Sequence, residues 1–528
     1  KTAAQLITEY GDLDTLLDRA NEIKQPKRRQ NLIEQADLAR ISRDLVRLRD
    51  DVLVQPAIDS FAATMPDTAT LLGFLKAQDF KSLLVTMANR LGEAAPGDGD
   101  PATDVFNDNA PAYELVFDKS ALAAWSTAAT AAGTVAVDTE TTALDSMRAG
   151  LVGISLCIDP GRACYVPLAH TKPAEHGALN LGDPNAETAA DAAREQIAIN
   201  DAIAILKPML EDPGVLKVGQ NIKYDMHVLA RHNIELAPID DTMLLSYVID
   251  GGLHGHGMDE LARDFLGHET IKFSDVAGKG KSQISFAQVP LDTALDYAAE
   301  DAEVTLRLHR LLKPRLGAEH MVAVYETLER PLVPVLRQME ANGIRVDATY
   351  LKNLSDDFTI RLADLEREIY AMAGRKFNVG SPKQLGELLF DEMSLPGGKR
   401  GKTGAYGTNH DVLESLVDQG YKLPARVLDW RQLAKLKSTY SDALIEQINP
   451  DTKRVHTSYS QAAVTTGRLA SSDPNLQNIP VRTEEGRKIR RAFVADCGMK
   501  LMSADYSQIE LRLLAHVAGI DALKEAFH

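Results

Sequence analysis

Two carboxylates separated by one residue follow a short apolar run that begins at Thr134. Alternate residues of a β-strand share one face, so Asp138 and Glu140 are expected to point in the same direction. Neighbouring carboxylates repel each other unless cations lie between them. Mg²⁺ or Mn²⁺ suits such a site, because these hard ions prefer oxygen ligands. Alternatively, Asp138 merely begins a turn, and the pair by itself is equally compatible with both interpretations.

Two later segments add carboxylates in helical settings. Asp225 opens a predicted helix after the strand-like run Leu216–Gly219, where an acid can also stabilise a helix N-terminus through the helix dipole. Tyr297 and Asp301 are four residues apart on another predicted helix, so their side chains lie side by side. Such pairs are common on surfaces, and an isolated one is more typical of a structural contact. Two adjacent acids are expected to be surface charges on other helix faces: Asp296 and Glu300.

A third constellation lies in the runs Thr466–Pro480 and Met502–Arg512. The second run is predicted to be a strand that ends at Asp505 and then turns into an amphipathic helix. A carboxylate at the end of a strand is well placed to hold a metal-bound triphosphate. Taken alone, this pattern is weak evidence for such a site.

Composition limits the class of protein. The 528 residues are 45% apolar and 25% charged, which are ordinary globular values. No apolar run approaches the roughly 20 residues that span a bilayer, and we expect no signal peptide. The three cysteines are too few and scattered for a disulfide framework or a zinc site, which fits a reducing cytoplasm. The net charge of −17 argues only mildly against a polyanionic partner, because DNA binding depends on local basic patches.

The predicted elements divide the chain into segments. Residues 1–50 and 66–91 have amphipathic helical patterns, and residues 92–101 form a linker rich in Gly, Pro and Asp. Strands alternate with helices from about residue 112, including a hairpin around 159–162 and an Ala/Asp/Glu-rich surface insertion at 183–200. Helices dominate residues 290–372, a basic Gly-rich loop follows at 396–402, and the pattern becomes mixed α/β after residue 455.

The first three acidic segments, in this order and spacing, resemble the three motifs of DEDY proofreading exonucleases, which have a ribonuclease-H-like α/β fold. The resemblance implies that two metal ions are bound and that Tyr297 orients the attacking water. In-line hydrolysis of a phosphodiester needs an activated water and a stabilised leaving oxygen, and two ions supply both. The implied ligands of the two ions are Asp138, Glu140, Asp225 and Asp301.

The C-terminal run closely resembles motif A of the family A DNA polymerases. The resemblance implies that Asp505 is one of two metal-binding palm aspartates and that Glu510 excludes a ribose 2′-hydroxyl. The run Arg431–Tyr440 resembles the thumb helix that grips duplex DNA, and the loop Lys399–Lys402 resembles the thumb tip. The other implied contacts with DNA or substrate are made by Arg431, Lys435, Lys437, Arg468, Gln477, Asn478 and Gln508.

Together these resemblances predict a multi-domain α/β protein. The expected segments are a helical remnant of a 5′-nuclease domain (1–50), a helical connector and linker (51–111), an exonuclease domain (112–315), a helical thumb (316–455) and the start of a polymerase palm (456–528). Residue 1 is Lys, so we expect the native start to lie upstream. The fingers helix and second palm aspartate of the family do not occur in this sequence, so this stretch alone is not expected to extend a primer.

The resemblances also imply partners. These are DNA as primer–template and single-stranded 3′ ends, deoxynucleoside triphosphates in the longer protein, and divalent metal, for a monomer associated with a bacterial nucleoid. One alternative is a free-standing ribonuclease D-like exonuclease, which would lack motif A. Another is a non-catalytic DNA-binding protein, which would have lost at least one of the four carboxylates.

Overall fold

The computed structural model describes residues 2–48, 67–78, 80–91, 112–171, 195–401, 404–481 and 483–527. The linker at 92–101, most of the predicted insertion at 183–200, and Lys402 lie outside these residues. The chain forms two compact units, residues 1–99 and 100–528.

The first unit is helical where the sequence predicts helices. Asp12 accepts a hydrogen bond from the backbone N–H of Thr15 and so begins the second helix, directly after Gly11 has ended the first with φ +92°. Small apolar clusters hold the helices together, for example Leu72 against Leu84. The helices are α1 (Thr2–Tyr10), α2 (Leu13–Asp18), α3 (Pro26–Glu34), α4 (Ala36–Val46), α5 (Thr68–Ala77) and α6 (Lys81–Leu91).

A six-stranded sheet dominates the first part of the second unit. Its strands are β1 (Ala112–Leu115), β2 (Thr134–Thr141), β3 (Leu151–Asp159), β4 (Arg162–Pro167), β5 (Leu216–Gly219) and β6 (Ile239–Asp241), in the spatial order β1-β4-β3-β2-β5-β6. The β2-β3-β4 pairs are antiparallel, whereas β2, β5 and β6 run parallel. The hairpin predicted around residues 159–162 is the β3–β4 pair.

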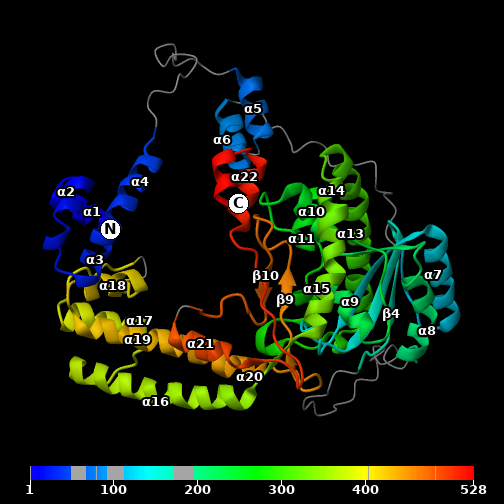
Figure 1. Ribbon diagram of the computed structural model, residues 1–528. Coiled ribbons are helices and arrows are strands. Elements are labelled where there is room, and N and C mark those ends of the chain that lie inside the picture. The colour runs from blue at the N-terminus through cyan, green and yellow to red at the C-terminus, as the bar shows by residue number, and fades with distance from the viewer. Residues whose placement is uncertain are drawn as a thin grey trace. The chain divides into compact units, whose positions relative to one another are not determined.

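Helices cover both faces of this sheet (Figure 1). On one face, α7 (Lys119–Ala132) and α8 (Ile199–Leu210) pack on Val135 and Val137 of β2. On the other, α13 (Leu291–Ala318) packs its small residues Ala299 and Ala302 on Ala136. Because these side chains are small, α13 lies close to the strand that carries Asp138. The remaining helices of this part are α9 (Lys223–Ala230), α10 (Thr242–Asp250), α11 (Met258–Leu261), α12 (Phe273–Ala277) and α14 (Val322–Val324).

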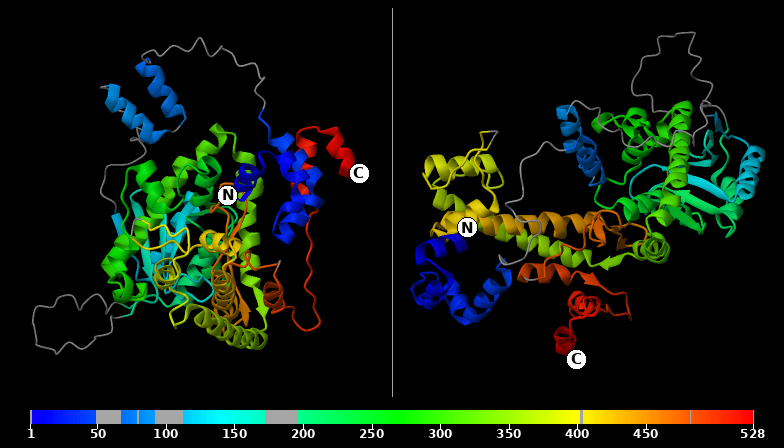
Figure 2. Two further views of the ribbon diagram at one scale, coloured as in Figure 1. Left: turned by 90° about the vertical axis from the view of Figure 1, so that its left-hand side faces the viewer. Right: turned by 90° about the horizontal axis from the view of Figure 1, so that it is seen from above.

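The rest of the second unit is built on long helices. Helices α16 (Ala348–Ala373) and α19 (Lys422–Leu436) pack side by side (Figure 2) around Phe358 and Leu433. The short strands β7 (Ile344–Val346), β8 (Arg454–Val455) and β11 (Phe493–Val494) form one sheet, and β9 (Ser458–Ser460) pairs with β10 (Ala470–Ser472). The other helices are α15 (Arg330–Asn342), α17 (Pro382–Gly386), α18 (His410–Asp418), α20 (Ala443–Glu446), α21 (Glu484–Arg490), α22 (Ile509–Val517) and α23 (Asp521–Phe527).

The strand expected to end at Asp505 is the main error in the predicted elements. Residues 501–506 are irregular and exposed, and Met502 is 90% exposed. A strand forms only where a neighbouring strand pairs with its backbone, and no described strand lies against this run. The predicted amphipathic helix does follow, as α22.

Candidate active site

Strand β2 positions the first two carboxylates. Asp138 is paired in register with Ser155 of β3, and Glu140 with Gly153, so both acids are on the same face of the sheet. The strand continues to Thr141 after a register shift, which places the acids inside the strand rather than at its end. Glu140 is 7% exposed, so this is a buried position for a charge.

Asp225 reaches the same strand from helix α9. Its Oδ1 accepts hydrogen bonds from the backbone N–H of Thr139 at 2.9 Å and from Thr139 Oγ1 at 2.6 Å. The amides of the two residues before this helix are bonded by Asp241 of β6, which accepts from Asn221 at 3.0 Å and from Ile222 at 3.1 Å. Asp225 is therefore tied to Thr139, the residue of β2 between the two other acids. Among the described residues no side-chain hydrogen bond caps α9, and Asp241 caps α10. Sequence reasoning missed Asp241, whose function depends on the β5–β6 pairing.

Helix α13 supplies Asp301 and Tyr297. The Tyr297 hydroxyl lies close enough to the Asp301 carboxylate to lower its pKa, as the four-residue spacing predicts. The Tyr297 ring packs against Phe273 and Phe286, with ring centroids 6.2 and 5.8 Å away. These aromatic contacts fix the direction of the phenol beside the carboxylates.

Three of the carboxylates come together in one cluster. Asp138, Glu140 and Asp301 each offer an oxygen within 4.8 Å of the others. Among the residues that the structure describes, this is the one group of three acidic, His or Cys side chains close enough to share an ion. Glu140 Oε1 is buried and has no hydrogen-bond partner. A buried, unpaired carboxylate oxygen in an all-oxygen cluster fits a divalent cation.

The electrostatics of the cluster also favour a bound cation. Burial raises the pKa of Asp138 to about 6. Burial also raises the pKa of Glu140, Asp225 and Asp301 well above their usual values, and the negative charge of Asp138 raises each of them further. Without a cation, the site therefore opposes ionisation of its own acids.

This opposition predicts a pH-dependent effect of metal on stability. The folded pKa values exceed the unfolded ones, so the cluster destabilises the fold increasingly as pH rises above about 4. A divalent ion offsets that repulsion. At pH 7.5 we expect Mn²⁺ at about 100 times its Kd to raise Tm by roughly 5 °C or more, and at pH 5 by much less. Thermal unfolding at both pH values measures this difference, and an equal shift at pH 5 and 7.5 would contradict it.

Two neighbours of the site differ from expectation or were missed. Glu300 is not a surface charge: it is 8% exposed and accepts from His268 Nε2 at 2.8 Å and the Ile271 N–H at 2.7 Å, because the chain around these residues folds over α13. Asp296 is exposed, as predicted. Gly153 was missed, although a β-carbon there would lie 2.1 Å from the Tyr165 hydroxyl, so only glycine lets Tyr165 pack beside Glu140.

The predicted polymerase residues near the C-terminal end are exposed and loosely connected. Asp505 lies in the irregular run before α22. Arg468 and Glu510 form an ion pair at 2.9 Å with side chains 75% and 80% exposed, an arrangement that contributes little stability. Gln477 donates to the Leu469 carbonyl at 3.0 Å. Of the other two residues, Asn478 lines a groove beside α19, and Gln508 directly precedes α22.

The three basic residues predicted to contact DNA from the thumb helix differ in their contacts and exposure. The Arg431 guanidinium turns to Thr408, donating to its carbonyl and, at 3.2 Å, to its hydroxyl. Lys437 pairs with Asp442 at 2.7 Å. Lys435 is exposed at the end of α19, so it is the member of this trio best placed to meet a phosphate.

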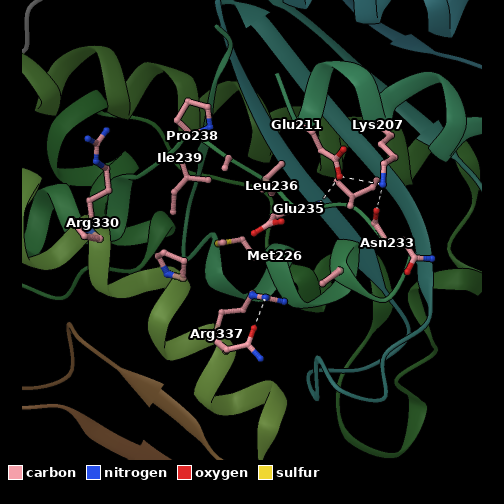
Figure 3. Close-up of a pocket in the computed structure, with 16 residues that line it drawn as sticks. Lys207, Glu211, Met226, Asn233, Glu235, Leu236, Pro238, Ile239, Arg330 and Arg337 are labelled. Atoms are coloured by element: carbon pink, nitrogen blue, oxygen red, sulfur yellow. Dashed lines mark hydrogen bonds and ion pairs between the residues drawn. The ribbon is translucent and has the colours of Figure 1, made fainter. Parts of the chain in front are cut away.

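Other hollows lie away from the carboxylates. A cavity of about 840 Å³ lies between the chain around Pro238, the end of α8 and helix α15. Met226, Arg330 and Arg337 are among the residues that line it (Figure 3). Its lining includes none of the candidate catalytic residues. We therefore take the carboxylate cluster, and not this cavity, as the candidate active site.

Comparison with known proteins identifies three matching families. Residues 113–317 match the family described as 3'-5' exonuclease, residues 348–528 match DNA polymerase family A, and residues 1–69 match 5'-3' exonuclease, C-terminal SAM fold. The C-terminal part of the chain thus matches DNA polymerase family A, and the part before it matches a 3'-5' exonuclease family. The expected α/β fold class, with a ribonuclease-H-like exonuclease domain before a helical polymerase region, is confirmed.

Curated proteins named DNA polymerase I align along the whole chain. The DNA polymerase I of Rhizobium leguminosarum is 48% identical over 598 residues, covering 100% of this chain and 58% of the relative. That of Pseudomonas aeruginosa is 43% identical and covers 100% of this chain and 57% of the relative. The chain thus spans less than two thirds of the length of these relatives.

A solved structure supports the same assignment. The POL domain of Pol1 from M. smegmatis, in complex with DNA primer-template and dNTP, aligns with a TM-score of 0.62 at 30% identity. The alignment covers 78% of this chain and 64% of that one. None of the described helices has the length and apolar character required to cross a membrane.

Proposed function

We propose that the exonuclease domain removes nucleotides from DNA 3′ ends by two-metal-ion hydrolysis and so proofreads a polymerase. The cluster of Asp138, Glu140 and Asp301, with the unpaired Glu140 Oε1 inside it, carries the proposal. In this mechanism the cluster and Asp225 hold Mg²⁺ or Mn²⁺. Bound ions would activate the attacking water and stabilise the leaving oxygen.

The chain's own residues have separate roles in this reaction. Thr139 holds Asp225 through two hydrogen bonds, so that its other oxygen remains available to an ion. Tyr297 orients the attacking water through its hydroxyl. Burial raises the Tyr297 pKa above its usual value, so the phenol keeps its proton at neutral pH and acts as a hydrogen-bonding group, not as a base.

The direct test is an excision assay on the full chain. With Mg²⁺ or Mn²⁺, a 5′-labelled single strand should shorten stepwise from its 3′ end, and a chelator should stop the reaction. A strand blocked at its 3′ end should resist. Shortening from the 5′ end, or shortening that a chelator does not affect, would contradict the proposal.

We further propose that residues 348–528 contribute the thumb and part of the palm to template-directed DNA synthesis in a protein of the relatives' length. The match to DNA polymerase family A supports this. So does the alignment with a POL domain whose complex contains DNA primer-template and dNTP. In this role Asp505 binds catalytic metal and Glu510 excludes ribonucleotides. The proposed DNA contacts include Lys435, Arg468, Gln477, Asn478 and Gln508.

The proposed contact between α19 and DNA phosphates predicts that Lys435 contributes to the salt dependence of DNA affinity. Lys435 is exposed beside a groove of about 850 Å³ that Asn478 also lines. Lys435→Gln should reduce the slope of log affinity against log salt for primer–template DNA by about 1, since one phosphate contact is lost. Lys383→Gln, at α17, is the matched control and should leave the slope unchanged. Equal slopes for both variants would make Lys435 an ordinary surface lysine.

The alternatives are less well supported. A free-standing ribonuclease D-like exonuclease does not account for the match of residues 348–528 to DNA polymerase family A. A non-catalytic DNA-binding protein does not account for four buried or partly buried acids at one site. We also propose that the protein acts as a monomer on nucleoid DNA in a bacterial cytoplasm.

A further inference from the structure

Glu340 is a buried glutamate that lies between the two main family matches and is bonded to the helix that carries Asp225. It belongs to α15 and is 4% exposed. Its Oε2 accepts from His227 Nε2 at 2.6 Å. Its Oε1 accepts from Lys223 Nζ and, at 2.6 Å, from the backbone N–H of Tyr459 in β9. One carboxylate thus joins the exonuclease helix to the polymerase segment.

The two donors on α9 share a helix face. Lys223 and His227 are four residues apart, so they lie on one side of the helix. Asp225 is two residues from each, which is about 200° around the helix axis and therefore on the opposite side. That side bonds Thr139 of β2. Helix α9 is consequently held from both sides, by β2 on the inside and by Glu340 on the outside.

The position of α9 depends on these contacts because the helix is short. It has eight residues, and Asp241 holds the amides of Asn221 and Ile222, the two residues before it. Lys223 is 8% exposed and pairs with Glu340, so loss of the carboxylate charge leaves a buried ammonium without its counter-ion. Without the bonds to Glu340 the outer face of α9 is no longer held, so the helix shifts and Asp225 moves with it.

We propose that Glu340 is a positioning residue of the exonuclease centre. By holding the outer face of α9, it fixes Asp225 against β2, so a residue outside the exonuclease domain completes the metal site. This inference rests on the proposed exonuclease function.

The test is Glu340→Gln in the full chain. Partners that orient metal ligands typically change metal affinity or activity by about 10–100-fold when they are lost. We therefore expect Mn²⁺ binding to the cluster, measured by calorimetry without DNA, to weaken about tenfold or more. We also expect single-turnover excision to slow by at least a similar factor, with a higher Mn²⁺ concentration needed for half the maximal rate.

Glu303→Gln is the matched control. Glu303 is also a buried glutamate with three donors: Tyr113 Oη at 2.8 Å, the Gly161 N–H at 2.9 Å, and Arg307. Its partners hold the β1 edge and the β3–β4 hairpin, and none lies on α9. Glu303→Gln should lower Tm but leave Mn²⁺ affinity and excision within about twofold. If Glu340→Gln likewise lowers Tm but leaves Mn²⁺ affinity and excision within about twofold, the positioning role is wrong.

A second variant covers the case in which Glu340→Gln does not fold. Glu340→Gln combined with Lys223→Met leaves no buried ion unpaired, and it should fold yet retain the defect in Mn²⁺ binding. Normal binding in this double variant would overturn the proposal. Failure of the proposed function is distinguishable from failure of this inference. If the proposed function is wrong, the wild-type chain does not excise. If only this inference is wrong, the wild-type chain excises and the Glu340 variants excise at the same rate.

Discussion

Replacing Asp138 and Glu140 together with alanine is expected to abolish metal-dependent excision while leaving the fold intact. Both acids lie on one face of β2, and together with Asp301 they form the cluster that fits a divalent ion. Without two of these three carboxylates the site would not hold the ion, which would activate the attacking water. The rate of 3′ excision should fall by about 10⁴-fold or more, measured in single turnover with saturating enzyme.

The same double variant should also be more stable than the wild type, although it is less active. Burial raises the pKa of both acids, so their ionisation destabilises the metal-free protein at neutral pH. The double variant should therefore unfold at a higher temperature than the wild type without metal, and Mn²⁺ should no longer shift its Tm. Asp292→Ala with Asp296→Ala, two exposed acids on α13, is the control and should excise normally. Retained excision in the Asp138/Glu140 variant would refute the site.

The acids of this site could be found from the sequence because each lies in a strongly patterned element. The run before Asp138 predicts a buried strand, and the spacing of Tyr297 and Asp301 predicts one helix face; the structure contains both. The order of the three segments then supports their meeting at one place. Spacing alone did not decide between a helix cap and a site residue for Asp225, and only the bonds to Thr139 do so.

The predictions from sequence are wrong where tertiary contacts determine the local structure. Glu300 has the sequence context of a surface charge, but His268 and the Ile271 amide come from a loop that no local pattern places over α13. The strand predicted before Asp505 has a suitable apolar pattern, but a strand also needs a partner, and no described strand pairs with it. The sequence could not identify the role of Glu340 either, since its donors come from residues 223, 227 and 459, which are distant in the sequence.

Tyr297→Phe is expected to slow excision at least tenfold with almost no change in stability. The substitution removes one hydroxyl and keeps the ring that packs against Phe273 and Phe286. A single positioned group of this kind typically contributes about 10²–10⁴-fold to a hydrolysis rate. Mn²⁺ affinity should stay close to that of the wild type, because the four carboxylates are unchanged. Single-turnover excision at saturating metal, with calorimetric Mn²⁺ binding, separates the effect on the rate from an effect on the metal.

Tyr113→Phe provides the matched control, because its hydroxyl hydrogen-bonds a carboxylate on α13, that of Glu303 at 2.8 Å. Both substitutions therefore remove a phenol hydroxyl that lies beside a carboxylate of α13, and burial raises the pKa of both phenols above the usual value. Only Tyr297 lies beside the cluster. Equal excision rates for the two variants would make Tyr297 a packing residue, whereas a loss confined to Tyr297→Phe, at unchanged Mn²⁺ affinity, assigns its hydroxyl to the attacking water.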